Sequence, residues 1–232
     1  MENIKHIFFD LDNTLWDYRK NAEFTLKKLF KDFEVEEKYG ISFQAFYAAY
    51  YEINDLLWKG FSAGTVSREE IHQRRFTETL AKLNIDDIDL GLAIEKRFMN
   101  EVAESDYLVD GTEEILHYLK GKYRLHILSN GFKAITHQKI NNCMIKDFVE
   151  TITTSEDAGI AKPHPTAFQT AINQSDARAD NSLYIGDDWI ADMVGATGFG
   201  MQAIYFNPLN ETHPWIDEVP VIDQLIELKE YL

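Results

Sequence analysis

The stretch Ile4-Lys5-His6-Ile7-Phe8-Phe9-Asp10-Leu11-Asp12-Asn13-Thr14 decides the fold of this 232-residue chain. Residues 4–9 form a short apolar run of β-branched and aromatic side chains, which predicts a strand buried on both faces, as in a parallel sheet. Two acids, Asp10 and Asp12, follow at its carboxyl end. Because open α/β sheets bind ligands at the carboxyl ends of their strands, both acids are expected in a binding crevice.

Similar short apolar runs recur along the chain, separated by segments long enough for helices. They are residues 123–128, 149–153, 182–185 and 201–205. Strands that alternate with helices predict an α/β fold with a doubly wound, mainly parallel sheet.

About 110 residues separate the first predicted strand from the second, far more than a strand-helix-strand crossover needs. Apolar residues recur there at three- and four-residue spacing, which is typical of amphipathic helices. The helices are expected at residues 17–33, 42–59, 67–83 and 87–102. The chain is therefore expected to have an α/β core domain (residues 1–15 and 107–232) and an inserted all-helical cap domain (residues 16–106).

The charge balance restricts the classes of partner. Lys and Arg number 23 against 39 Asp and Glu, a formal charge of −16, which disfavours binding to a nucleic acid polymer or an anionic membrane. No stretch resembles a transmembrane span, and cytoplasmic residence is the expectation. A small anionic substrate would need a metal ion and a few placed cations to neutralise it.

Polar residues follow the later predicted strands as well. They are Ser129-Asn130-Gly131, Lys162, and Gly186-Asp187-Asp188. Acids crowded in one crevice repel one another unless a cation holds them, and hard oxygen ligands suit Mg²⁺. A Mg²⁺ cofactor is therefore predicted.

These residue types suit phosphoryl transfer. Asp10 can attack phosphorus in line with the leaving oxygen, and Asp12 can protonate that oxygen and later deprotonate the hydrolytic water. Ser129, the adjoining backbone N–H groups and the Lys162 ammonium can bind phosphoryl oxygens.

The chain resembles the haloacid dehalogenase superfamily of phosphotransferases over nearly its whole length. The stretches that look like the superfamily's four motifs are Phe9–Leu15, Leu128–Gly131, Lys162-Pro163, and Gly186-Asp187-Asp188 with Asp192. The resemblance implies a Rossmann-like core, Asp10 as nucleophile and Asp12 as acid/base. The dehalogenases of the superfamily typically lack the second acid of the first motif, so Asp12 argues against that activity.

The resemblance also implies the ligand set. It implies Mg²⁺ bound by the Asp10 carboxylate, the Asp12 backbone carbonyl and Asp187, with Asp188 or Asp192 in support. It also implies a set of substrate-binding residues, which are Thr14, Ser129, Asn130, Gly131 and Lys162.

A narrower resemblance is to the house-cleaning pyrimidine 5′-nucleotidases, which act on nucleoside monophosphates. It is carried by Leu57–Gly60 with the helix that follows, Ser129–Phe132, and Ala158–Pro163. A phosphatase of sugar phosphates or phosphoglycolate, a phosphomutase, and a catalytically silent binding module remain as alternatives. The oligomeric state stays open.

Aromatic residues are dense in the expected cap. Phe43, Phe46, Tyr47 and Tyr50 fall at i, i+3, i+4 and i+7, which predicts that most of them form the cap's own core. Trp16 and Tyr18, directly after the first motif, are the aromatic residues expected to contact the substrate.

Overall fold

The computed structural model describes residues 3–232, which form two compact units. The first unit ends at Tyr18 and resumes from Asp106 to Leu232, and the second comprises Arg19–Ser105. Residues 1 and 2, which belong to the expected core domain, lie outside the described residues.

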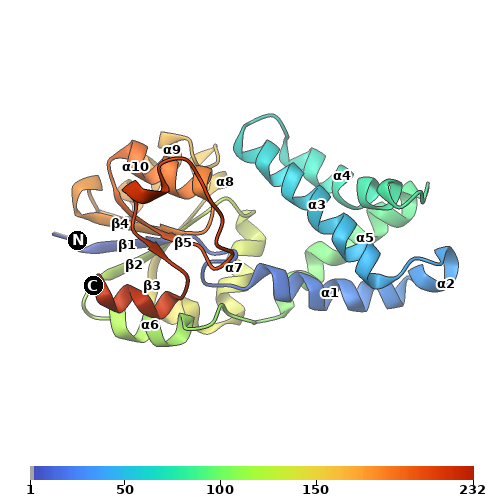
Figure 1. Ribbon diagram of the computed structural model, residues 1–232, viewed down its shortest axis with the longest axis horizontal. Coiled ribbons are helices and arrows are strands. Elements are labelled where there is room, and N and C mark those ends of the chain that lie inside the picture. Colours follow the sequence, from blue (N-terminus) through green and yellow to red (C-terminus); the bar gives the residue numbers. More distant parts are fainter. Residues whose placement is uncertain (1–2) are drawn as a thin grey trace. The chain divides into compact units, whose positions relative to one another are not determined.

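The first unit contains a six-stranded parallel sheet (Figure 1). Its strands are β1 (His6–Phe9), β2 (Arg124–Ser129), β3 (Val149–Thr154), β4 (Ser182–Gly186), β5 (Gln202–Phe206) and β6 (Val221–Ile222). The strand order is β3-β2-β1-β4-β5-β6. The chain therefore runs outward on one side of β1 and then crosses to its other side, so the topological switch point lies at β1, where α/β sheets bind ligands.

Helices cover both faces of this sheet. They are α6 (Thr112–Leu119), α7 (Lys133–Asn142), α8 (Ser155–Ala158), α9 (Pro165–Ser175), a π-helical turn (Trp189–Val194), α10 (Gly195–Phe199) and a C-terminal 3₁₀ segment (Leu225–Glu230). Figure 1 shows α9 and α10 on one face and α6 on the other. The doubly wound α/β fold is confirmed.

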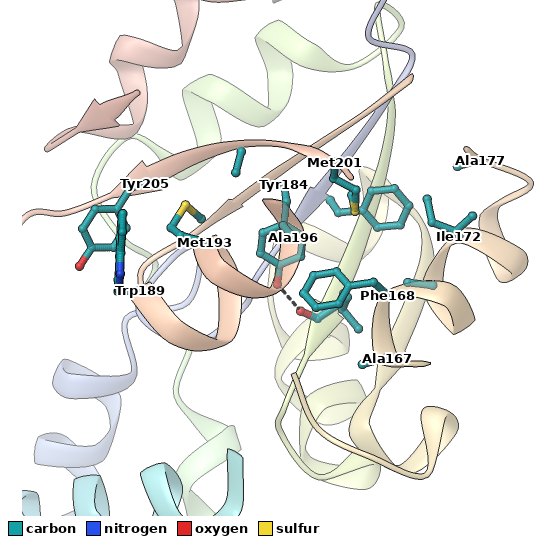
Figure 2. Packing of buried hydrophobic residues seen from close by; sticks show 14 residues of the cluster. Ala167, Phe168, Ile172, Ala177, Tyr184, Trp189, Met193, Ala196, Met201 and Tyr205 are labelled. Carbon is teal, nitrogen blue, oxygen red and sulfur yellow. Dashed lines mark hydrogen bonds between the residues drawn. The ribbon is translucent and has the colours of Figure 1, made fainter. Parts of the chain in front are cut away.

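One face of the sheet packs into a continuous apolar cluster (Figure 2). Phe168 of α9 meets Tyr184 of β4 edge to face, with ring centroids 5.6 Å apart. Tyr184 is fully buried, and its hydroxyl donates a 2.8 Å hydrogen bond to the carbonyl of Leu128 on β2. Tyr184 therefore has an apolar ring in the core and a polar tip among the strand ends.

The second unit is helical. Its helices are α1 (Tyr18–Asp32, whose first residue belongs to the first unit), α2 (Val35–Tyr39), α3 (Phe43–Ser62), α4 (Arg68–Lys82) and α5 (Ile88–Glu101). Ser67 and Glu70 form a reciprocal capping box at the start of α4. None of the helices within residues 3–232 has the length and apolar character needed to cross a membrane.

Two short elements were not expected from the sequence, and one helix is longer than expected. The five residues of α2 and the two of β6 are too few to show a periodic pattern. The helix expected at residues 42–59 continues through Gly60, and α3 ends at Ser62. A side chain at Gly60 would collide with Val66, so close packing explains this glycine better than a turn.

Two of the four aromatic residues expected in the core of the helical unit, Phe46 and Tyr50, lie there, whereas Phe43 and Tyr47 are only half-buried. Phe46 and Tyr50 of α3 are fully buried and stack on Phe76 of α4, with centroids 6.4 and 5.3 Å away. Phe98 of α5 meets Tyr50 edge to face at 5.7 Å. These rings join three helices.

A charged pair is buried beside this aromatic core. Arg75 donates two hydrogen bonds to Glu95, at 2.9 and 2.6 Å, and a third to Asn54 at 3.3 Å. Burial alone would raise the pKa of Glu95, but the charge of Arg75 and the hydrogen bond from His72 outweigh it, so its pKa is lowered. Glu95 is therefore ionised at neutral pH.

We predict that Glu95→Leu lowers the free energy of unfolding by about 3–5 kcal/mol, because it removes the carboxylate that neutralises the buried Arg75 guanidinium. The double variant Arg75→Met/Glu95→Leu should recover most of this loss. Urea denaturation followed by circular dichroism measures both, with Glu23→Gln, at an exposed ion pair with Lys27, as the control. Equal losses in the single and double variants would contradict the prediction.

A pair of histidines is buried at the start of β1 and β2. The Nδ1 of His6 and the Nε2 of His126 lie 3.1 Å apart, and the Nδ1 of His126 lies 2.9 Å from the Thr151 hydroxyl. Burial lowers the pKa of His126 to about 3, with smaller contributions from His6 and Arg124. His126 is thus neutral in the folded protein.

We predict acid-dependent loss of stability from this pair. Between pH 6.5 and about 3 the unfolded chain binds a proton at His126 that the folded chain does not, so stability falls as pH drops below 6.5. The slope from one such group approaches ~1.4 kcal/mol per pH unit. Urea unfolding at pH 7, 6 and 5 should show a shallower dependence in His126→Gln than in wild type or in the exposed control His117→Gln.

Candidate active site

Lys162 lies at the centre of the polar cluster beyond the carboxyl ends of the strands. Its side chain is 2% exposed, and its Nζ contacts Asp10 Oδ1 at 2.8 Å, Asp192 Oδ1 at 2.7 Å and the Tyr184 hydroxyl at 2.7 Å. Burial would lower the pKa of Lys162, but the charges of Asp10 and Asp192 outweigh burial and raise it. The ammonium is therefore held as a cation between two carboxylates.

Three carboxylates converge at this point. Carboxylate oxygens of Asp10, Asp187 and Asp192 lie within 4.8 Å of one another. Burial, followed by the charge of Asp192, raises the pKa of Asp10 to about 7 against the lowering effect of Lys162. Burial and the charges of Asp10 and Asp192 raise the pKa of Asp187 well above its usual value. One lysine does not offset three buried acids.

The donor set fits a magnesium ion. All three converging groups offer oxygen, the ligand type that Mg²⁺ prefers, and a divalent cation would relieve the repulsion that raises their pKa values. Asp192 already has a partner on each oxygen, Lys162 at Oδ1 and the Asp188 N–H at Oδ2. Asp10 and Asp187 are therefore the acids best placed to hold a cation.

The segment after β4 brings Asp192 to this position. Gly186 ends β4, and a Cβ atom there would collide with the Asp192 carboxylate, so only glycine allows the approach. Asp188 caps the following helical turn by accepting hydrogen bonds from the backbone N–H groups of Ile190 and Ala191, at 2.9 and 2.8 Å. Asp188 thus shapes the turn that carries Asp192.

Thr14 lies beside Asp187. Its hydroxyl, which is fully buried, donates a 2.9 Å hydrogen bond to Asp187 Oδ1. This bond holds the Asp187 carboxylate at one oxygen. The substrate-binding role expected for Thr14 stays a prediction.

The loop after β2 is tied to the backbone of Lys162. The Asn130 side chain accepts a 2.7 Å hydrogen bond from the Lys162 N–H and donates one of 3.0 Å to the Lys162 carbonyl. The hydroxyl of Ser129 accepts a 3.0 Å bond from the Gly131 N–H. The Asn130 side chain therefore positions the backbone of Lys162.

Asp12 lies in a separate environment from Asp10. Its Oδ1 accepts a 2.6 Å hydrogen bond from Lys139 of α7, and its Oδ2 lies 3.6 Å from the place where a Cβ on Gly131 would be. Ser129 Oγ lies 3.2 Å from the same place. The structure thus brings the first and second sequence motifs together.

Trp16 does not present a surface to substrate. Its ring is fully buried, and Lys139 Nζ lies 4.3 Å from its centroid. The expectation of substrate contact by Trp16 is therefore wrong for this conformation.

Sequence reasoning missed two side chains of the site, Tyr184 and Lys139, and gave Asp192 only a supporting role. Tyr184 lies in a predicted strand, and Lys139 belongs to none of the sequence motifs. No local pattern marks Tyr184 or Lys139, since one lies within an apolar strand and the other within a mixed helix. Their contacts join residues that are far apart in the sequence.

Known proteins resemble this chain both in sequence and in fold. The family model of the haloacid dehalogenase-like hydrolases matches residues 4–200. The magnesium-bound crystal structure of the HAD-hydrolase YfnB from Bacillus subtilis superposes with a TM-score of 0.88 at 25% identity, covering 100% of this chain and 99% of that one.

Two curated relatives are named as phosphatases. The pyrimidine 5′-nucleotidase YjjG of Escherichia coli is 27% identical over 97% of this chain and 96% of its own length. A glyceraldehyde 3-phosphate phosphatase of Pyrococcus abyssi is 29% identical over 88% of this chain and 81% of its own length. Since the family model covers most of the sequence and the fold agrees, this protein belongs to the haloacid dehalogenase-like hydrolase family.

Proposed function

We propose that this protein is a Mg²⁺-dependent phosphatase of small phosphomonoesters that acts through an aspartyl-phosphate intermediate, with pyrimidine nucleoside 5′-monophosphates as its preferred substrates. The observation that carries the proposal is the separation of two carboxylates in one site. Asp10 lies against Lys162 in a buried acid cluster, and Asp12 lies against Lys139 beside the loop after β2. The two acids are suited to different chemical roles.

In this mechanism Asp10 is the nucleophile. Its carboxylate forms a bond to phosphorus while the bond from phosphorus to the ester oxygen breaks, and Asp12 gives that oxygen a proton. Asp12 then takes a proton from the water that attacks the aspartyl phosphate, which releases phosphate and restores Asp10. A bound Mg²⁺, held by Asp10, Asp187 and the Asp12 backbone carbonyl, would supply charge neutralisation at the phosphoryl group.

The remaining polar groups bind and orient the phosphoryl group. The positive charge of Lys162 stabilises the non-bridging oxygens, and Asn130 fixes the Lys162 backbone through two hydrogen bonds. Ser129 and the N–H groups of the same loop offer further hydrogen bonds. The helical residues 16–106 are proposed as the cap domain of this enzyme, acting on small substrates rather than polymers.

The choice of pyrimidine nucleotides rests on the sequence resemblance and on the relative named as a pyrimidine 5′-nucleotidase. The relative named as a glyceraldehyde 3-phosphate phosphatase makes sugar phosphates the main competing class. Fold and catalytic residues alone do not choose between them.

We predict Mg²⁺-dependent phosphate release from UMP, dUMP and dTMP, with kcat/KM at least ~10-fold above that for AMP and GMP, a difference worth about 1.4 kcal/mol of transition-state stabilisation. A colorimetric phosphate assay over a panel with glyceraldehyde 3-phosphate, phosphoglycolate and glucose 1-phosphate measures this, with EDTA as the metal-free control. Preference for a sugar phosphate would overturn the nucleotide assignment alone. An isomerised sugar phosphate without free phosphate would identify a phosphomutase, and inactivity on every ester would overturn the phosphatase.

We also predict that Asp10→Asn and Asp12→Asn fail at different steps. Asp10→Asn should lose phosphate release and all covalent labelling by a radioactive phosphate ester, because an amide is no nucleophile here. Asp12→Asn should lose about 10²–10⁴-fold in turnover but still become labelled by p-nitrophenyl phosphate, whose leaving group departs unprotonated. Full turnover of Asp10→Asn, or equal labelling of both variants, would contradict the aspartyl-phosphate mechanism.

A further inference from the structure

Lys139 is a buried cation on α7 that the mechanism above does not use. The residue is 4% exposed, and its Nζ lies 2.6 Å from Asp12 Oδ1. Burying an ammonium group is costly unless a partner compensates it. Among residues 3–232, Asp12 is the carboxylate within ion-pair distance of this ammonium.

Aromatic rings flank the same ammonium group. The centroid of Trp16 lies 4.3 Å from Lys139 Nζ, and that of Tyr18 lies 5.3 Å away. Both distances are within the range of cation–π attraction. The rings and the carboxylate together restrict where the ammonium can lie, so Lys139 is a fixed charge and not a mobile surface lysine.

The pairing distinguishes the two oxygens of Asp12. Oδ1 is occupied by Lys139, whereas Oδ2 faces the space above Gly131. The hydroxyls of Ser129 and Thr136 face this space too, lying 3.2 and 2.6 Å from the place of a Cβ on Gly131. Thr136 is fully buried, and its Oγ1 lacks a hydrogen-bond partner within the described part of the chain.

Lys139 and Thr136 therefore belong to one group of side chains around the Asp12 carboxylate. They lie three residues apart on α7, which places them on the same helix face, toward Asp12 and the loop after β2. One occupies Oδ1 and the other lines the polar space that Oδ2 faces. An unpaired buried hydroxyl is costly in a purely structural region, which favours a role for this space in the reaction.

We propose that Lys139 is a positioning residue for the acid/base step: by holding Oδ1 of Asp12, it directs Oδ2 to the oxygen of the leaving group. This inference rests on the proposed phosphatase function. In the first step the proton moves from Asp12 Oδ2 to the ester oxygen as the phosphorus–oxygen bond breaks, and Lys139 gives up no proton. A lysine that acts in this way matters most when the leaving oxygen needs a proton.

The test compares Lys139→Met with wild type on two substrates, UMP and p-nitrophenyl phosphate, in the presence of Mg²⁺. The quantity measured is kcat/KM, which reports the steps up to departure of the leaving group. Lys139→Met should lose at least ~10-fold in kcat/KM on UMP, because alkoxide departure needs general acid catalysis. On p-nitrophenyl phosphate it should lose less than about 3-fold, because nitrophenolate departs unprotonated.

Three further variants separate positioning from folding and from charge. Lys139→Arg keeps the cation and should restore part of the UMP activity, whereas Lys139→Gln should behave like Lys139→Met. Lys133→Met removes an exposed lysine from the same helix, one that pairs with Asp157, and should retain wild-type kinetics on both substrates. If Lys139→Met does not fold, the Gln variant decides the comparison.

The outcomes separate this inference from the proposed function. Equal losses on both substrates, or no loss on either, would overturn the positioning role while the phosphatase assignment stands. If wild type hydrolyses no ester of the substrate panel, the phosphatase function is wrong and the role of Lys139 falls with it. If UMP is a poor substrate but another alkyl phosphate is hydrolysed, that ester replaces UMP and the same ratio decides.

Discussion

The buried ammonium of Lys162 stays charged only because Asp10, Asp192 and Tyr184 surround it. An ion removed from water in this way needs close partners on every side, so each of these groups constrains the position of the others. Lys162 comes from the segment after β3, Asp10 from the end of β1, and Asp192 from the turn beyond β4. This one contact joins three strand ends at the switch point of the sheet, where the reaction is proposed to occur.

Smaller features of the chain make this contact possible. Gly186 lacks the Cβ atom that would collide with Asp192, and Asp188 caps the turn that delivers Asp192. Asn130 accepts from and donates to the Lys162 backbone. Some residues of the sequence motifs are therefore best explained as supports for Lys162 and Asp10.

A second charged pair, Lys139 with Asp12, gives the site its asymmetry. Asp10 belongs to a cluster with an excess of acid, which a bound cation would neutralise, whereas Asp12 already has its own counter-charge. Two carboxylates two residues apart can serve as nucleophile and proton carrier only if their surroundings differ. The α7 helix provides that difference through Lys139.

The sequence by itself determined the α/β fold, the helical insertion and the convergence of the acids. Hydrophobic periodicity is a local property, and residues that follow parallel strands must meet at one edge of the sheet. Only the tertiary structure decided the partners of each charge: Tyr184 and Asp192 at Lys162, and Lys139 at Asp12. These partners are 22, 30 and 127 residues apart in the chain, and no local pattern links them. Burial makes each pairing obligatory, because a charge without a partner is unstable in a medium of low dielectric constant.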